Sequence, residues 1–204
     1  MKKLYSLFVL ILSISFINVS LAYVPEGISL DKNSGGYTIS FNLPSYHLNT
    51  VTVNNENYYT IDIADYGVIS EAGLPALPQL SFNMFIPYSE VNPSVSVVRI
   101  SSEIMELKQN IYPFQPPWEK NYDLSDRPFT IDRNYYNSSG KTYEPIEISE
   151  PFIINGVKGI IVTIHPFNYN PLQNELTITN SAEFRLNLNN SVVPVSGKSV
   201  SFNN

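Results

Sequence analysis

The sequence predicts a single all-β domain behind a signal peptide, with the antiparallel β-sandwich architecture of immunoglobulin-like or jelly-roll-like proteins. Apolar and polar residues alternate with a period of two over much of the chain, and helical periodicity is nearly absent. Turn-forming Gly, Pro and Asn pairs separate these stretches at a spacing of roughly ten residues, which is typical of sandwiches. The 14 tyrosines and 11 phenylalanines supply bulky side chains, so the composition favours a folded core.

The first 22 residues have the three-part order of a secretory signal peptide. Lys2 and Lys3 form a positive start, an apolar stretch follows over 4–19, and Ala22 is a small residue just before Tyr23. The apolar stretch is short for a membrane span of ~20 residues and contains polar side chains, which argues against an anchor. We therefore expect cleavage between Ala22 and Tyr23 and a secreted product, extracellular or periplasmic, with no membrane as partner.

Seven stretches have the alternation expected of strands. They are Tyr37–Leu43, Tyr59–Ile63, Leu80–Ile86, Val95–Ile100, Ile146–Ile154, Ile160–Ile164 and Phe184–Leu188. The segment Glu103–Asn110 also has apolar residues at helical spacing, but we predict a strand there because its surroundings are β. Asn155-Gly156 is the strongest hairpin signal in the chain, since this pair favours a type I′ turn.

One domain is expected over residues 23–190, because about 180 residues is an ordinary length for a single domain. A stretch of about 30 residues at 113–144 has no clear strand pattern, and loops of that length are commonly functional. It is rich in Tyr, Asn, Asp and Pro and includes several basic residues. Residues 191–204 have the Pro, Ser and Gly content of a linker and are predicted to lead out of the domain.

Residue types needed for catalysis and metal binding are scarce. The chain has no cysteine, only two histidines, and no G-x-S-x-G nucleophile motif. We expect His47 at the surface and His165 in a structural role at a strand end. There is no zinc or calcium motif, and a net charge of −6 without a basic cluster argues against nucleic acid as a partner. We therefore predict no enzyme activity, no metal and no cofactor.

Three segments in a fixed order carry a resemblance to a known family. The first is Asp65–Pro78, which contains the pattern G-x-x-x-E-x-G-x-P-x-L-P; the others are Ile111–Pro117 and Glu150–Pro171. This order and spacing resemble the N-terminal propeptide domain of gingipain-type (family C25) cysteine peptidases. The resemblance covers nearly the whole chain from Tyr23 to Leu188.

Two glycines of the first segment have a local role that is independent of any family. Gly67 and Gly73 are both predicted to occupy turn positions with positive φ, which only glycine adopts readily.

The resemblance implies a non-catalytic prodomain of a secreted gingipain-like cysteine endopeptidase. In that family the prodomain is a β-sandwich that acts as an intramolecular chaperone and keeps the peptidase latent. The implied partner is the catalytic domain of a cognate C25 cysteine peptidase, bound in cis or in trans. The Cys/His catalytic domain itself would lie beyond Asn204.

The loop at 113–144 is the candidate inhibitory element, because a prodomain loop in this family brings a side chain to the specificity pocket. Arg127 and Arg133 are the candidate residues, with Lys120 behind them. A guanidinium group pairs with a carboxylate through two hydrogen bonds, which would suit an acidic pocket. The alternative for each of the three is an ordinary solvated loop charge.

A binding module is the competing interpretation. We expect four aromatic residues of the loop to be exposed, where they could stack on sugar rings; they are Trp118, Tyr122, Tyr135 and Tyr136. A Cys/His peptidase domain encoded after Asn204 would distinguish the prodomain from a secreted carbohydrate- or surface-binding module. A row of further β-domains there would instead indicate an adhesion or assembly module.

Overall fold

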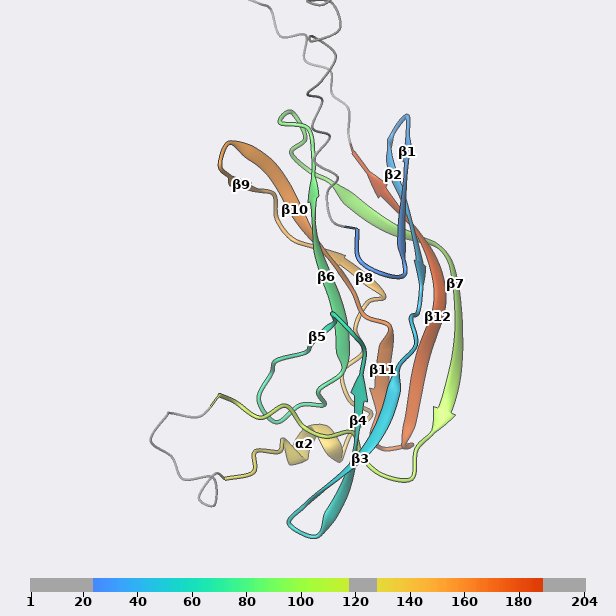
Figure 1. Ribbon diagram of the computed structural model, residues 1–204, viewed down its shortest axis with the longest axis vertical. Helices are drawn as coiled ribbons and strands as arrows, with labels where there is room; N and C mark the ends of the chain where they lie inside the picture. Colours follow the sequence, from blue (N-terminus) through green and yellow to red (C-terminus); the bar gives the residue numbers. More distant parts are fainter. Residues whose placement is uncertain (1–23, 118–127, 189–204) are drawn as a thin grey trace, which may run out of the picture.

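The computed structural model describes residues 24–117 and 128–188 (Figure 1). The predicted signal peptide, its cleavage point at Ala22 and Tyr23, and the predicted linker at 191–204 lie outside these residues. The regular secondary structure of the described residues is almost entirely β-strand, with one short helix. The elements are β1 (Ile28–Asn33), β2 (Gly36–Asn42), β3 (His47–Val53), β4 (Glu56–Asp62), β5 (Gly67–Val68), β6 (Pro78–Phe85), β7 (Ser94–Glu106), α2 (Arg133–Tyr136), β8 (Ile146–Ile148), β9 (Phe152–Ile154), β10 (Val157–Ile164), β11 (Phe167–Asn170) and β12 (Glu175–Asn187).

The first sheet is built around the long strand β12. One edge of β12 pairs antiparallel with β7 over its whole length. The other edge pairs with β11 in its first half and with β2 in its second half, and β1 continues the sheet beyond β2. A register shift between Thr179 and Ser181 marks an irregularity where β12 passes from one half to the other.

The second sheet is built around β6 and β10. β5 pairs with the outer edge of β6, while β8 and β9 share the far edge of β10. Ile154 lies opposite Val157, so the β9–β10 turn has two residues, Asn155 and Gly156, with φ of 51° and 77°. Positive φ at both positions is the geometry of a type I′ turn. The hairpin predicted from Asn155-Gly156 is confirmed.

Buried apolar residues join the two sheets into one core. A first cluster takes Ile39, Phe41 and Phe184 from the first sheet and Phe82 and Val162 from the second, among others. Because both sheets turn apolar side chains toward this cluster, they pack face to face (Figure 1). The antiparallel all-β class predicted from period-two alternation is confirmed.

A second cluster fills the other end of the molecule. Leu176 and Ile178 of β12 and Phe167 of β11 meet Ile61 of the β3–β4 hairpin and Ile111. β12 therefore contributes to both clusters, and it connects the two ends of the core.

Several strand predictions need revision in detail. The predicted strand Ile146–Ile154 is two strands, β8 and β9, because the Ser149 side chain accepts a hydrogen bond from the Ile161 backbone and Pro151 has no N–H to donate. The strand predicted at Glu103–Asn110 is confirmed as far as Glu106, where β7 ends. Strands β1, β3, β5 and β11 and the first half of β12 were not predicted. In β11, four residues between two prolines give too short an alternation. Across the described residues, no helix is long and apolar enough to span a bilayer.

Candidate functional site

The two ends of the predicted loop are held together by one glutamine. The Gln115 side chain accepts a hydrogen bond from Thr130 N at 2.9 Å and donates to the Thr130 and Pro113 carbonyl oxygens at 2.8 and 2.9 Å. These bonds join positions 15 residues apart in the sequence. We call residues 111–117 and 128–132, which this clasp brings together, the neck of the loop.

The first sequence motif lies against the neck through Gly73. Gly73 N donates to Phe114 O at 2.9 Å, and Asp132 N donates to Gly73 O at 3.0 Å, so one residue bonds both sides of the neck. Gly73 has a φ of +83°, and a Cβ there would lie 2.8 Å from Asp132 N. The prediction for Gly73 is confirmed, whereas that for Gly67 is wrong: Gly67 lies in β5 without a positive φ and has room for a Cβ.

Aromatic rings pack the neck onto the β3–β4 hairpin. The ring of Phe129 lies 5.4 Å from that of Tyr58 and 5.7 Å from that of Tyr112, with Tyr58 and Tyr112 6.0 Å apart. Tyr58 Oη donates to Glu56 Oε2 at 2.6 Å. Burial, followed by this hydrogen bond, raises the pKa of Tyr58 to about 12, so the phenol stays protonated.

A one-turn helix follows the neck and turns its tyrosines inward. The Asp132 side chain caps α2 by accepting from the backbone N–H groups of Asn134 and Tyr135. Tyr135 is buried, and the half-buried Tyr136 donates its hydroxyl to Ile111 O at 2.6 Å. The prediction that both are exposed aromatics is therefore wrong, because the turn of helix buries Tyr135 and packs Tyr136 against the second core cluster. Trp118 and Tyr122 lie outside the described residues.

Only one of the three basic candidates lies in the described part of the chain. Arg133 is exposed in the first turn of α2, beside a polar pocket that Glu56, Tyr58 and Asn110 also line. Its positive charge lowers the pKa of Tyr58, against the larger effect of burial. Arg127 and Lys120 lie outside the described residues.

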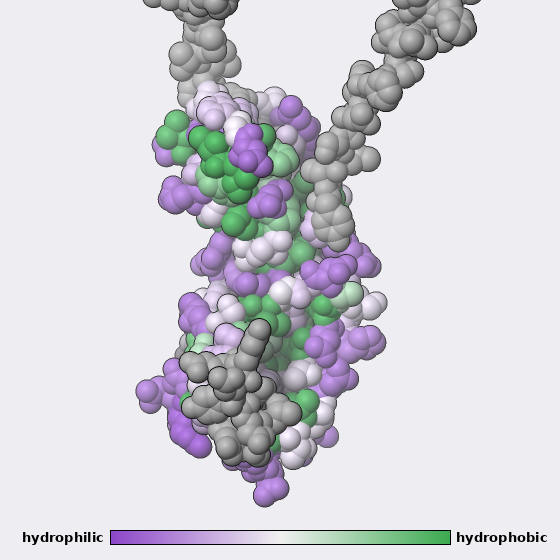
Figure 2. Space-filling model, turned by 60° about the vertical axis from the view of Figure 1, so that its left-hand side comes forward, coloured by the Kyte–Doolittle hydropathy of each residue, from purple (hydrophilic) through white to green (hydrophobic). Residues whose placement is uncertain are grey.

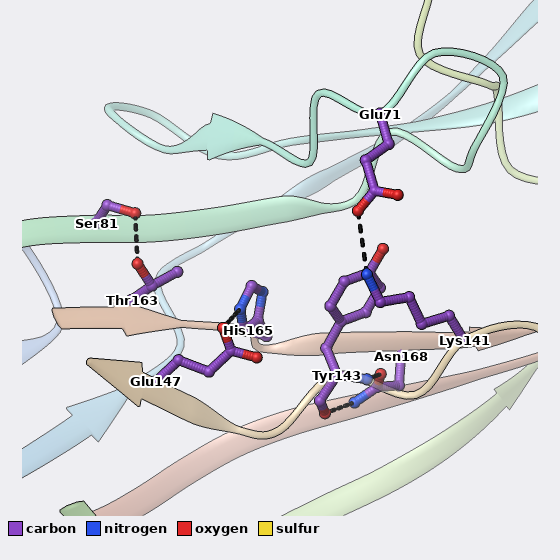
Figure 3. Close-up of polar contacts among 8 residues, drawn as sticks. All are labelled: Glu71, Ser81, Lys141, Tyr143, Glu147, Thr163, His165 and Asn168. Carbon is purple, nitrogen blue, oxygen red and sulfur yellow. Dashed lines mark hydrogen bonds and ion pairs between the residues drawn. The ribbon is translucent and has the colours of Figure 1, made fainter. Parts of the chain in front are cut away.

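A second polar cluster links the far end of the predicted loop to the first motif (Figure 3). Lys141 Nζ lies 3.1 Å from Glu71 Oε1 and 4.6 Å from the centre of the Tyr143 ring. The Tyr143 ring stacks on His165 at 5.1 Å, and the Tyr143 backbone exchanges two hydrogen bonds with the Asn168 side chain. Both ends of the loop are thus anchored to the body of the domain.

The histidines lie where the sequence predicts. His47 is exposed on β3, and His165 is buried at the end of β10. Among residues 24–117 and 128–188, no group of three or more His, Asp or Glu side chains is placed to hold a metal ion.

A family model for the C25 propeptide (Propeptide_C25) matches residues 20–203 of the chain. The chain belongs to the C25 propeptide family.

Curated relatives of this C25 propeptide come from Porphyromonas gingivalis. Gingipain R2 is 31% identical and Gingipain R1 29% identical, each over 111 residues or 54% of this chain. Lys-gingipain is 23% identical over 155 residues, which are 74% of this chain. The matched segments are only 9–15% of the length of these relatives.

Solved structures share the fold. The chain superimposes with a TM-score of 0.70 on a chain from the complex of the pro- and mature domains of RgpB from Porphyromonas gingivalis, at 20% identity. That superposition covers 81% of this chain and 85% of the other. A structure of gingipain K, concerned with its zymogenic latency, gives the same TM-score at 19% identity over 82% and 96% of the two chains. A C25 propeptide is not the catalytic domain, in agreement with the absence of any cysteine nucleophile from the sequence.

The sequence located this site only in outline. The predicted loop and Gly73 are part of it, but Gln115 was not singled out, although it lies inside the second motif. Its role depends on the distant partner Thr130, and no local pattern reports such a pairing.

Proposed function

We propose that this C25 propeptide is the N-terminal prodomain of a secreted gingipain-like cysteine endopeptidase. In this role it assists folding of the catalytic domain and keeps it latent until the two are separated. The observation that carries the proposal is the family match over residues 20–203, together with the fold it shares with the RgpB and gingipain K chains.

The neck supports a latency role for the loop. An inhibitory loop loses less entropy on binding when its ends are already fixed. Gln115 and Gly73 fix the two sides of the neck, from which the chain continues past Pro117 and returns at Pro128. We propose that a basic side chain of this loop, Arg127, Arg133 or Lys120, enters the specificity pocket of the peptidase and pairs with a carboxylate there.

The same proposal includes export and proteolytic processing of the protein. Residues 1–22 act as a signal peptide that is removed between Ala22 and Tyr23, so the domain is the first part to emerge. Residues 191–204 act as a linker to the peptidase, and a cut in this linker or in the loop ends latency.

Inhibition in trans tests the proposal. The purified chain is titrated into the mature forms of Gingipain R1, Gingipain R2 and Lys-gingipain, and hydrolysis of short Arg and Lys substrates is measured. We expect inhibition of at least one of them. No inhibition and no complex with any of the three would refute the prodomain role.

Substitutions then identify the side chain in the pocket. We expect one of Arg127→Ala, Arg133→Ala and Lys120→Ala to raise the inhibition constant roughly a hundredfold, because a charged partner in the pocket is left unpaired. The other two serve as controls for a general effect of loop charge. Unchanged inhibition by all three variants would exclude a basic side chain as the inhibitory group.

The carbohydrate-binding alternative loses support from the packing of α2. Tyr135 is buried, and the half-buried Tyr136 holds its hydroxyl on Ile111 O, so neither ring lies free on the surface for a sugar to stack on.

A further inference from the structure

The outer face of the second sheet has an apolar end at the β9–β10 hairpin. Residues that lie directly opposite in antiparallel strands point to the same side. Gly159 lies opposite both Phe85 of β6 and Phe152 of β9, so these two aromatic residues flank a glycine on one face. Ile154 and Val157, the last pair before the turn, point to that same side.

These side chains are exposed to a degree unusual for their type. Phe85 is 57% exposed, Ile154 61% and Val157 45%. A Cβ on Gly159 would meet the Phe152 ring at 3.4 Å, so the ring covers the glycine and continues the apolar surface. Figure 2 shows hydrophobic residues gathered at the end of the molecule where this hairpin lies. We call Phe85, Phe152, Ile154, Val157 and Ile161 the hairpin patch.

The outer faces of the two sheets differ in their content of charged side chains. No outward residue of β6 or β10 is charged; these are Gln79, Ser81, Asn83, Phe85, Val157, Gly159, Ile161 and Thr163. Glu147 of β8 brings a charge to this face opposite Thr163, at the end of β10 away from the hairpin patch. The first sheet instead turns Arg185 outward, along with the ion pair Arg99–Glu183 at 3.1 Å. Charge depletion at an exposed apolar surface is the mark of the core of a protein–protein interface.

The hairpin patch lies on the same side of the molecule as the neck of the loop. In Figure 1 the β9–β10 hairpin and the described stretches of chain that adjoin residues 118–127 all extend to the left. Figure 2 brings that side to the front. A partner that binds the loop from this side therefore faces the outer surface of the second sheet. The hairpin patch lies on that sheet at the end of the molecule opposite the loop.

We propose that the hairpin patch is a second docking surface for the catalytic domain of a C25-type cysteine peptidase, remote from the loop. The inference rests on the proposed prodomain function. The loop blocks the substrate site, while the patch buries apolar area and holds the domain on the peptidase. Linking two contacts on one rigid body raises the affinity of the whole without any change in the loop.

A matched pair of double variants tests the patch. Ile154→Ser with Val157→Ser removes its exposed end; Ile104→Ser with Val98→Ser removes residues that are 64% and 53% exposed on β7, at the opposite sheet. We expect the first pair to raise the inhibition constant against the gingipain that the wild-type chain inhibits by roughly tenfold or more. The β7 pair should leave it within about twofold, and both should melt at the wild-type temperature, because exposed side chains contribute little to folding.

The absence of cysteine allows a direct probe of burial. An environment-sensitive dye attached to Ile154→Cys should change its emission when the inhibited complex forms. The same dye at Ile104→Cys should not respond.

The outcomes separate this inference from the function on which it rests. If the wild-type chain inhibits none of the gingipains, the prodomain function and the docking surface are both refuted. If it inhibits one and the patch variant inhibits equally well, the prodomain role stands and the docking surface is refuted. Sedimentation of the free chain tests the remaining alternative, which is self-association through the patch. If the wild-type chain is a dimer, and Ile154→Ser with Val157→Ser makes it a monomer without changing inhibition, the patch is a dimer interface and the inference is refuted.

Discussion

His165 lies at the end of β10 with neither ring nitrogen hydrogen-bonded, although it is only 5% exposed. Its Nε2 lies 3.9 Å from the Glu147 carboxylate, too far for a hydrogen bond (Figure 3). Burial lowers the pKa of His165 below its ordinary value of 6.5, and the Glu147 charge opposes this only in part. The unfolded chain therefore takes up this proton at a higher pH than the folded one.

This difference predicts a loss of stability in acid. As the pH falls below about 6.5, proton uptake by the unfolded state should reduce the free energy of unfolding by up to about 1.4 kcal/mol per pH unit. His165→Phe should remove that contribution and leave stability near neutral pH unchanged or higher, since no unpaired nitrogen remains buried. Urea unfolding between pH 7 and pH 5 measures the slope.

His47→Phe is the control, because His47 is the other histidine and is exposed on β3. Its acid slope should match the wild type. An equal slope in His165→Phe would show that other groups cause the acid sensitivity.

At the level of elements, the turn at Gly73 and the loop flanks form one unit. Backbone bonds from Gly73 to Phe114 and Asp132 place the first motif between the two sides of the neck. The second motif supplies Gln115, so two of the three family motifs meet at this point. These two motifs, although separated in the sequence, are in contact in the structure, and their contact holds the neck of the loop in place.

Gly73→Ala should break this unit. The positive φ and the 2.8 Å approach to Asp132 N both oppose a side chain, so we expect a loss of roughly 1–3 kcal/mol in the free energy of unfolding. The neck should shift as well, and the inhibition constant against a responsive gingipain should rise. Gly67→Ala is the matched control from the same motif, because its Cβ would meet only Gln79 O at 3.8 Å. Similar behaviour of the two variants would contradict this account of the neck.

Across the whole molecule, β12 joins the two halves of the core. Phe184 belongs to the first cluster and Ile178 to the second, and both are fully buried. A strand that is continuous through both clusters couples them, since neither can lose its packing without disturbing the pairing of β12 with β7.

This coupling predicts a single unfolding transition. Phe184→Ala should cost about 3–5 kcal/mol and Ile178→Ala about 2–5 kcal/mol, each through the cavity it leaves. Far-UV and near-UV circular dichroism should then give coincident melting curves for both variants. Separate transitions in Ile178→Ala alone would show that the second cluster is an independent unit.

The sequence by itself determined the features that depend on neighbours along the chain. Period-two alternation predicted the antiparallel all-β class, and Asn155-Gly156 predicted the turn of the β9–β10 hairpin. The order of the motifs identified the family. Each of these signals is local, because backbone preference and the alternation of side chains need no knowledge of distant partners.

The tertiary structure decided which side chains meet and which are covered. Tyr135 was expected to be exposed but is buried, because α2 turns its ring inward, with the hydroxyl near Tyr169 O. Gln115 clasps the loop only because Thr130 returns beside it. The hairpin patch likewise exists because Phe85 and Gly159 are in register across strands far apart in the chain. Register between distant strands selects the neighbours of every side chain, and no local pattern encodes it.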